Sequence, residues 1–130
     1  MEMEVSLGEI EIKDVDEFLA GIQKISSEYN VVIQAIDADK IVSREHVEKA
    51  VEKAMQAMED GRNLTKDLGL EILLYASGQR QIEKALKMGI SKGKNRVAIV
   101  VLPKSEDAIR RIKEVTELKE REILNNIEKE

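Results

Sequence analysis

The apolar positions near the N-terminus predict a strand followed by a helix. Apolar and polar residues alternate through residues 3–13, as in an edge or half-buried strand, and Gly8 allows a bulge or a turn there. Asp14 is placed as a helix N-cap, with Glu17 three residues later as in a capping box. Over residues 18–25 the apolar side chains then recur at helical spacing, which predicts the first helix.

The following segments predict a buried strand and an amphipathic helix. Residues 31–36 form a nearly continuous, β-branched run, which is typical of a strand covered on both faces. Ser43 is a good N-cap for a helix over residues 44–60, where Val, Ala and Met return every three or four positions. Gly61 stands where the residue after a helix is commonly glycine, so we expect the helix to end there.

The middle of the chain is apolar on nearly every side. Periodicity alone fits either a helix or a strand over residues 67–77, but its Leu residues are not β-branched, so we predict a buried helix. A second helix is predicted over residues 79–88. A polar, lysine-rich loop over residues 91–95 and a buried strand over residues 96–102 are expected to follow.

The last third of the chain predicts two further helices. Ser105 is placed to cap a helix whose inward positions extend to Val115. Residues 118–129 are highly charged with a narrow apolar stripe, which fits a terminal helix that packs, self-associates or frays. Because strands alternate with helices, we expect an α/β (mixed α+β) fold, with a small three- to four-stranded sheet and about six helices in one domain over residues 1–130.

Composition supports a folded and soluble domain. Hydrophobic residues make up 42% and charged residues 36% of the 130 residues, and there is no Cys. The lack of Cys excludes disulfides, thiolate nucleophiles and Cys-based zinc sites. No apolar run approaches the roughly 20 residues that span a bilayer, and the acidic start, residues 1–5, lacks the basic region of a signal peptide. We therefore expect a cytoplasmic protein with no membrane partner.

Charge is unevenly distributed along the chain. The net charge is −5, which argues against indiscriminate coating of nucleic acid. Residues 61–104, however, hold nine Lys and Arg against three Asp and Glu, whereas the remainder holds twelve basic and twenty-three acidic residues. Aromatic residues are too few for a base-stacking sheet surface. A basic groove that holds an RNA end or loop remains open, as does an ordinary fluctuation of sequence.

The sequence offers little catalytic chemistry. His46 is the only His and falls in the first turn of a predicted helix, where a surface or capping position is ordinary. Asp37 and Asp39 fit a solvated turn better than a cation site. Residues 91–96 have the Lys and Gly of a phosphate loop without the order of a Walker motif. We expect no catalytic residue, no metal and no cofactor.

One long motif resembles a known family. It comprises Asn-Leu-Thr-Lys at residues 63–66, Leu-Glu-Ile-Leu-Leu-Tyr-Ala-Ser-Gly-Gln-Arg-Gln-Ile at residues 70–82, Ala-Leu at residues 85–86 and Gly-Ile at residues 89–90. The Ser-Arg-Glu-His block at residues 43–46 and the predicted strand at residues 96–102 fit the same pattern. The chain is thereby similar to the KEOPS complex accessory subunit family, whose animal member is called the PRPK-binding protein. Its brevity and its Lys- and Glu-rich composition resemble an archaeal member.

The resemblance implies a function that the residues alone do not. Members of that family are non-catalytic subunits of KEOPS, which makes threonylcarbamoyl-adenosine beside the tRNA anticodon. They bind the atypical kinase/ATPase subunit directly, and the rest of the complex through it, and they bind tRNA through its 3′ CCA end. Two rivals stay open: a purely structural kinase-binding protein without RNA binding, and a small-molecule-binding α/β regulator.

Two sets of site residues follow from the charge pattern together with the resemblance. The tRNA-binding set is Arg62, Asn63, Lys66, Gly78, Gln79, Arg80, Gln81, Lys84, Lys92, Lys94 and Arg96. The kinase-binding set is Leu73, Tyr75, Ala76, Ile82 and Leu86. Arg80 and Lys84 are four residues apart and would share one helix face, and Gly78 would let a ligand approach the backbone closely. The alternative is a solvated basic helix face beside a helix that is entirely core.

Overall fold

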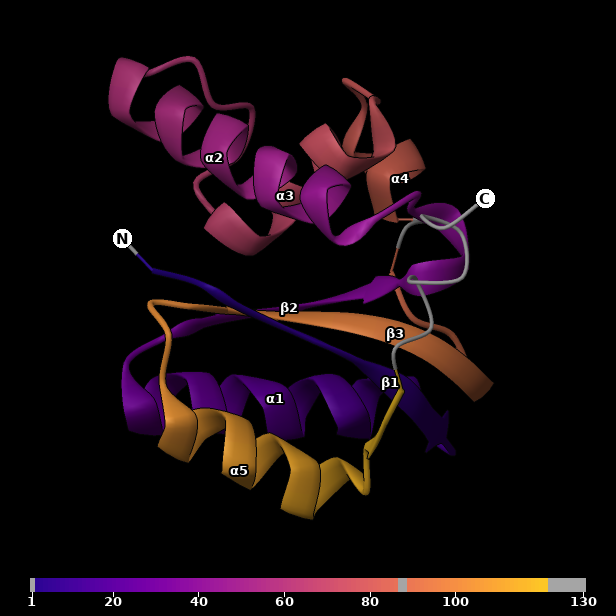
Figure 1. Ribbon diagram of the computed structural model, residues 1–130. Coiled ribbons are helices and arrows are strands. Elements are labelled where there is room, and N and C mark those ends of the chain that lie inside the picture. Colours follow the sequence, from indigo (N-terminus) through magenta and orange to yellow (C-terminus); the bar gives the residue numbers. More distant parts are fainter. Residues whose placement is uncertain (1, 87–88, 122–130) are drawn as a thin grey trace.

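The computed structural model describes residues 2–86 and 89–121, and it has the expected mixed architecture. Its elements are β1 (Glu4–Ile12), α1 (Val15–Tyr29), β2 (Val32–Asp37), the 3₁₀ helix η1 (Ala38–Lys40), α2 (Arg44–Asp60), α3 (Leu68–Ser77), α4 (Ile82–Ala85), β3 (Gly93–Leu102), α5 (Glu106–Thr116) and β4 (Lys119–Glu120). The four strands form one antiparallel sheet in the order β2-β3-β1-β4. Helices α1 and α5 cover one face of the sheet, and α2, α3 and α4 lie over the other (Figure 1).

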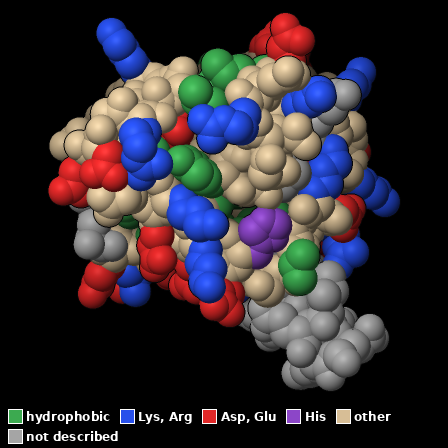
Figure 2. All heavy atoms as spheres, turned by 90° about the horizontal axis from the view of Figure 1, so that it is seen from above, with side chains coloured by type: hydrophobic (Ala, Val, Ile, Leu, Met, Phe, Trp, Pro, Cys, Tyr) green, Lys and Arg blue, Asp and Glu red, His purple; other side chains and the backbone are tan. Residues whose placement is uncertain are grey.

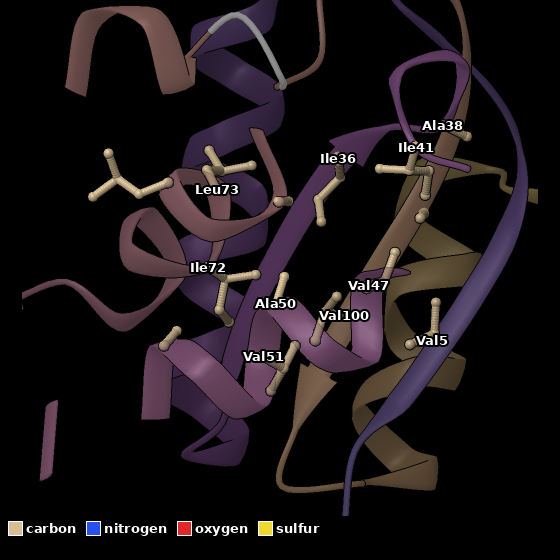
Figure 3. Packing of buried hydrophobic residues seen from close by; sticks show 14 of the residues in the cluster. Val5, Ile36, Ala38, Ile41, Val47, Ala50, Val51, Ile72, Leu73 and Val100 are labelled. Carbon is tan, nitrogen blue, oxygen red and sulfur yellow. The ribbon is translucent and has the colours of Figure 1, made fainter. Parts of the chain in front are cut away.

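The sheet separates two hydrophobic cores. On β3, Ala98 and Val100 belong to the core under α2 and α3, whereas Val97 and Ile99 belong to the core over α1 and α5. This strand is buried on both faces, as its continuous apolar run predicts. The core under α2 and α3 gathers side chains from β1, β2, α2, α3 and β3, several of which are labelled in Figure 3.

Strand β1, expected to be an edge or half-buried strand, has neither an edge position nor the bulge or turn that Gly8 would allow. Its register with β3 is unbroken, so Val5 faces one core and Ile10 the other by simple alternation. The glycine in its middle, Gly8, has a different purpose, because a Cβ atom there would collide with the backbone carbonyl of Lys119 in β4. Of the two expected placements, the edge position is wrong, since β4 pairs along the outer side of β1 at Gly8 and Glu9, and only the half-buried strand remains.

The predicted helix ends are confirmed where a side chain or glycine specifies them. Asp14 accepts a hydrogen bond from the Glu17 amide at 3.0 Å, which fixes the start of α1. The Ser43 hydroxyl accepts one from the His46 amide at 3.1 Å at the start of α2. Gly61 ends α2 in the left-handed conformation, at φ 73°.

Three predicted segments are different in the structure. The helix expected over residues 79–88 contracts to α4, because Gly78 turns left-handed and Gln81 is extended; residues 87–88 lie outside the described residues. The loop expected over residues 91–95 is partly strand, since β3 already begins at Gly93. The C-terminal helix expected from residue 118 is contradicted by β4, while residues 122–129 lie outside the described residues. None of the described helices is both long and apolar enough to cross a bilayer.

Candidate functional site

A hollow of about 240 Å³ lies where the loop after α2 meets α3 and the turn that follows α3. We call it the first hollow. Its lining residues are Arg62, Leu64, Glu71, Leu74, Tyr75, Gly78, Gln79 and Arg80. Four of the eleven residues predicted to bind tRNA therefore lie together here. They come from the two sides of α3 in the sequence, Arg62 before it and residues 78–80 after it, and α3 brings them together.

Glu71 on α3 ties the loop after α2 to this helix. Its side chain is only 1% exposed. Its Oε1 atom accepts hydrogen bonds from the backbone N–H groups of Leu64 at 3.0 Å and Thr65 at 3.2 Å. The Asn63 side-chain amide donates to the Thr65 carbonyl at 2.8 Å, so Asn63 shapes the same loop. These contacts compensate part of the cost of burying a carboxylate and hold the loop in place.

Arg62 lines the hollow and forms an ion pair with Asp60. Its Nη2 atom lies 2.9 Å from Oδ2 of Asp60, and both side chains are well exposed. Hydrogen bonding to Asp60 raises the pKa of Arg62, and Tyr75 acts in the same direction. The hydrogen bonds from Arg62 and then Gln56 hold the pKa of Asp60 below its usual value. Arg62 is thus a fixed positive charge near the aromatic side chain of the hollow.

The turn after α3 presents Arg80. Gly78 ends α3 in the left-handed conformation, at φ 69°, and the Gln79 amide donates to the Ser77 hydroxyl at 3.1 Å. Arg80 is exposed, and no acidic residue within the described part of the chain forms an ion pair with it. Its guanidinium charge is therefore available to a ligand. The expectation that Arg80 and Lys84 share a helix face is wrong, because Arg80 precedes the short helix α4.

A second hollow, of about 640 Å³, contains two other residues of the predicted tRNA-binding set. We call it the second hollow. Its lining residues are Glu9, Ile10, Glu11, Asp39, Lys94, Asn95, Arg96, Thr116, Glu117 and Lys119. Arg96 Nη1 lies 3.3 Å from Asp39 Oδ1, and the sheet register places Glu9 opposite Arg96 and Glu11 opposite Lys94. Four acidic residues thus outnumber three basic ones.

The predicted basic residues consequently do not form one groove. Lys94 and Arg96 lie on β3 and share no lining residue with the first hollow. The other predicted members outside both hollows are Asn63, Lys66, Gln81, Lys84 and Lys92, all of them exposed except Asn63. The sequence could not separate these groups, because the separation depends on how β3 pairs with β1.

The predicted kinase-binding residues divide into buried and exposed members. Leu73 is 3% and Ala76 5% exposed, and both belong to the core under α2 and α3, so this chain offers neither as surface. Ile82 is 39% and Leu86 55% exposed, while Tyr75 is half-buried and lines the first hollow. Figure 2 shows that on the α2, α3 and α4 side apolar side chains lie between Lys and Arg side chains. The kinase role of these residues stays a prediction.

His46 has a role that the sequence did not indicate. Its Nδ1 atom accepts a hydrogen bond from the Val42 amide at 3.1 Å, and its Nε2 atom lies 2.9 Å from the Ala76 carbonyl oxygen. Because a carbonyl oxygen only accepts, Nε2 carries the ring proton. His46 therefore links the start of α2 to the end of α3, just before the turn that presents Arg80. No signal in the sequence identifies a partner thirty residues away.

Comparison with known proteins identifies the family. The family model described as "Kinase binding protein CGI-121" matches residues 11–129. A curated relative, "Regulatory protein Cgi121" of Methanocaldococcus jannaschii, is 32% identical over 82 residues, which is 63% of this chain and 52% of the relative. The matched part spans about half the length of that relative. No group of three or more His, Asp or Glu residues suited to a metal occurs among residues 2–86 and 89–121. The resemblance expected from the motif is thus confirmed, and the chain belongs to the kinase binding protein CGI-121 family.

Proposed function

We propose that this protein is a non-catalytic KEOPS subunit that acts in the cytoplasm, docks on the kinase/ATPase subunit and captures the 3′ end of tRNA in the first hollow. The family description supports the kinase partner. The observation that carries the RNA part is the pair of Arg62 and Arg80 beside a half-buried Tyr75, with Arg80 outside any ion pair among the described residues.

The chemistry of the first hollow suits a single-stranded RNA end. Guanidinium groups bind phosphate oxygens in a planar, often bidentate manner, which favours Arg62 and Arg80 as phosphate ligands. An aromatic ring such as Tyr75 offers a surface on which any base can stack. A hollow of about 240 Å³ admits a single nucleoside but not a duplex. The acidic remainder of the chain disfavours binding elsewhere.

The RNA part is tested by measuring the affinity of the protein for intact tRNA and for the same tRNA without its CCA end. We expect fluorescence anisotropy to give tighter binding of the intact tRNA. The alternative function, a purely structural kinase-binding protein, predicts no binding of either RNA at physiological salt. Equal affinity for the two RNAs would contradict capture of the end.

The kinase part is best assigned to exposed apolar residues near the first hollow. Ile82 and Leu86 project from the α4 region, and Leu64 in the loop after α2 is also exposed. Exposed large apolar side chains that gather on one face favour a protein partner. The test is co-purification of the KEOPS kinase with the Leu86→Asp variant. Val115→Asp is the matched control, because Val115 on α5 is similarly exposed but lies on the opposite side of the sheet. We expect loss of the kinase only with Leu86→Asp, and equal retention by both variants would remove this assignment.

A further inference from the structure

Glu71 is an unusual side chain to find in a hollow that attracts phosphates. It is almost completely buried, yet it lines the same hollow as Arg62 and Arg80. Within the described residues it forms no ion pair. A buried carboxylate without a cation is costly, and the two amide hydrogen bonds from Leu64 and Thr65 are its only compensation there. Among the described residues that line the first hollow, Glu71 is the one acidic side chain.

The two oxygen atoms of Glu71 have different surroundings. Both amide hydrogen bonds end on Oε1, which is the oxygen that holds the loop. No side-chain oxygen of the described residues is both sealed from solvent and without a hydrogen-bond partner. Oε2 accepts no hydrogen bond from the described residues, so it keeps a small exposure to solvent, and Glu71 is among the residues that line the first hollow. One oxygen holds the loop, and the other has no partner among the described residues.

The chemistry of a carboxylate determines what Oε2 can bind. An ionised carboxylate only accepts hydrogen bonds, so its ligand must donate from a hydroxyl or an amine. An anionic phosphate is repelled at the same position. In dinucleotide-binding folds an acidic side chain binds a ribose hydroxyl in this way. In an RNA chain a ribose presents two neighbouring hydroxyl groups only at an unblocked 3′ end, because every other ribose carries a phosphodiester on its 3′ oxygen.

We infer that Oε2 of Glu71 accepts hydrogen bonds from the hydroxyl groups of the 3′-terminal ribose, while Arg62 and Arg80 bind the phosphates that precede it. This inference rests on the proposed function. The first hollow would then be selective for an unblocked RNA end: an end with free hydroxyl groups binds, and an end that carries a 3′-phosphate is rejected. The base need not be recognised for this selection.

The experiment compares four forms of one tRNA by anisotropy with the full chain. They are the intact tRNA, the tRNA with a terminal 2′,3′-dideoxynucleotide, the tRNA with a 3′-phosphate and the tRNA without CCA. We expect loss of the hydroxyl groups to weaken binding by about tenfold, as for a charged hydrogen bond, and the 3′-phosphate to weaken it further. Glu71→Gln should keep the loop, because its amide oxygen still accepts from Leu64 and Thr65, but should lose most of the discrimination against phosphate.

The four RNAs separate the possible failures. If the tRNA without CCA binds as tightly as intact tRNA, the proposed function fails. If binding depends on CCA but the 3′-phosphate form binds as tightly as the hydroxyl form, capture of the end stands and the role of Glu71 is overturned. These comparisons use the wild-type protein alone, so they test the role of Glu71 even if Glu71→Gln does not fold. Glu59→Gln, which removes the same charge from the exposed end of α2, is the control and should discriminate like the wild type.

Discussion

The first and second hollows both contain basic residues from one stretch of sequence, but they differ in how many acidic residues compensate that charge: the first has one arginine, Arg80, outside any ion pair among the described residues. In the second hollow Arg96 is paired with Asp39, and β1 supplies Glu9 and Glu11 opposite β3. In the first hollow Arg80 has no acidic partner among the described residues, and the acidic residue in the lining, Glu71, is buried beneath. The first hollow should therefore attract a polyanion such as RNA more strongly than the second.

The difference shows that a count of charges along a sequence does not locate a binding surface. Residues 94 and 96 belong to the basic middle of the chain, but the sheet pairs them with residues 9 and 11 from its acidic start. Opposite charges directly across a pair of strands compensate each other at short range. Arg80 escapes this compensation because it lies in a turn, where no neighbouring strand imposes a partner. Four predictions test this comparison.

Charge reversal should produce the largest effect. We expect Arg62→Glu with Arg80→Glu to weaken tRNA binding by on the order of 100-fold, because two charge-assisted phosphate contacts are lost. The matched variant, Lys94→Glu with Arg96→Glu, changes the net charge equally and should weaken binding only a few-fold through the general field. Anisotropy at two salt concentrations measures both, and the first variant should also have the shallower salt dependence. Equal losses would mean that the two hollows do not differ in function.

The polar side chains that support the two hollows give a second test. Asn95 is buried and bonds to the backbone of Ser91 and Gly93 beside the second hollow, whereas His46 links α2 to the end of α3 near the first. Asn95→Ala and His46→Ala should each lower the free energy of unfolding by about 1–3 kcal/mol, because backbone groups that bond to the buried Asn95 or to the part-buried His46 lose their partners. Urea denaturation measures this.

RNA binding should distinguish these two variants. His46→Ala loosens the helix end that precedes Arg80, so we expect tRNA affinity to fall about threefold, a loss on the scale of one neutral hydrogen bond. Asn95→Ala should leave the affinity unchanged at a temperature where both proteins are folded. If Asn95→Ala weakens binding as much as His46→Ala, the second hollow takes part in the interaction.

Neutralising acidic residues of the second hollow should leave it with uncompensated positive charge, as in the first hollow. Glu9→Gln with Glu11→Gln leaves Lys94 uncompensated across the strands and should raise tRNA affinity about threefold, mainly through salt-sensitive, non-specific attraction. The gain should be as large for tRNA that lacks its CCA end. Glu106→Gln with Glu114→Gln on α5 is the charge-matched control and should give a smaller gain. An equal gain in the control would show that only net charge matters.

Some features of this fold follow directly from local sequence. Asp14, Ser43 and Gly61 set helix ends through contacts within a few residues, so their patterns predicted the boundaries. Residues 119–120 were predicted as helix but form β4, because pairing with β1 at Gly8 lies more than a hundred residues away in sequence. Gly8 by its residue type allows a bulge or a turn, but only the position of β4 beside it explains why no larger residue fits there.

The candidate site was predictable to the same limited extent. The motif and the basic middle pointed to Arg62, Gly78, Gln79 and Arg80, which the fold does bring together. They also pointed to Lys94 and Arg96, whose compensation by acids depends on strand register and is invisible in one sequence. The sequence does not mark Glu71, which lies in an apolar helix, because its role depends on the loop that folds back over it.

The smallest effect should come from the ion pair beside the first hollow. Because the folded-state pKa of Asp60 is lowered, the contribution of the Asp60–Arg62 pair is present at neutral pH and is lost only as the pH falls below about 4. Between pH 6 and pH 8 this pair should therefore add no pH dependence to RNA binding. Asp60→Asn removes a negative charge and releases Arg62, so we expect about twofold tighter tRNA binding, in keeping with the weakness of exposed pairs. Asp107→Asn, which removes the same charge and breaks the Arg110 pair on α5, is the control; an equal gain there would show that Asp60 does not restrain Arg62.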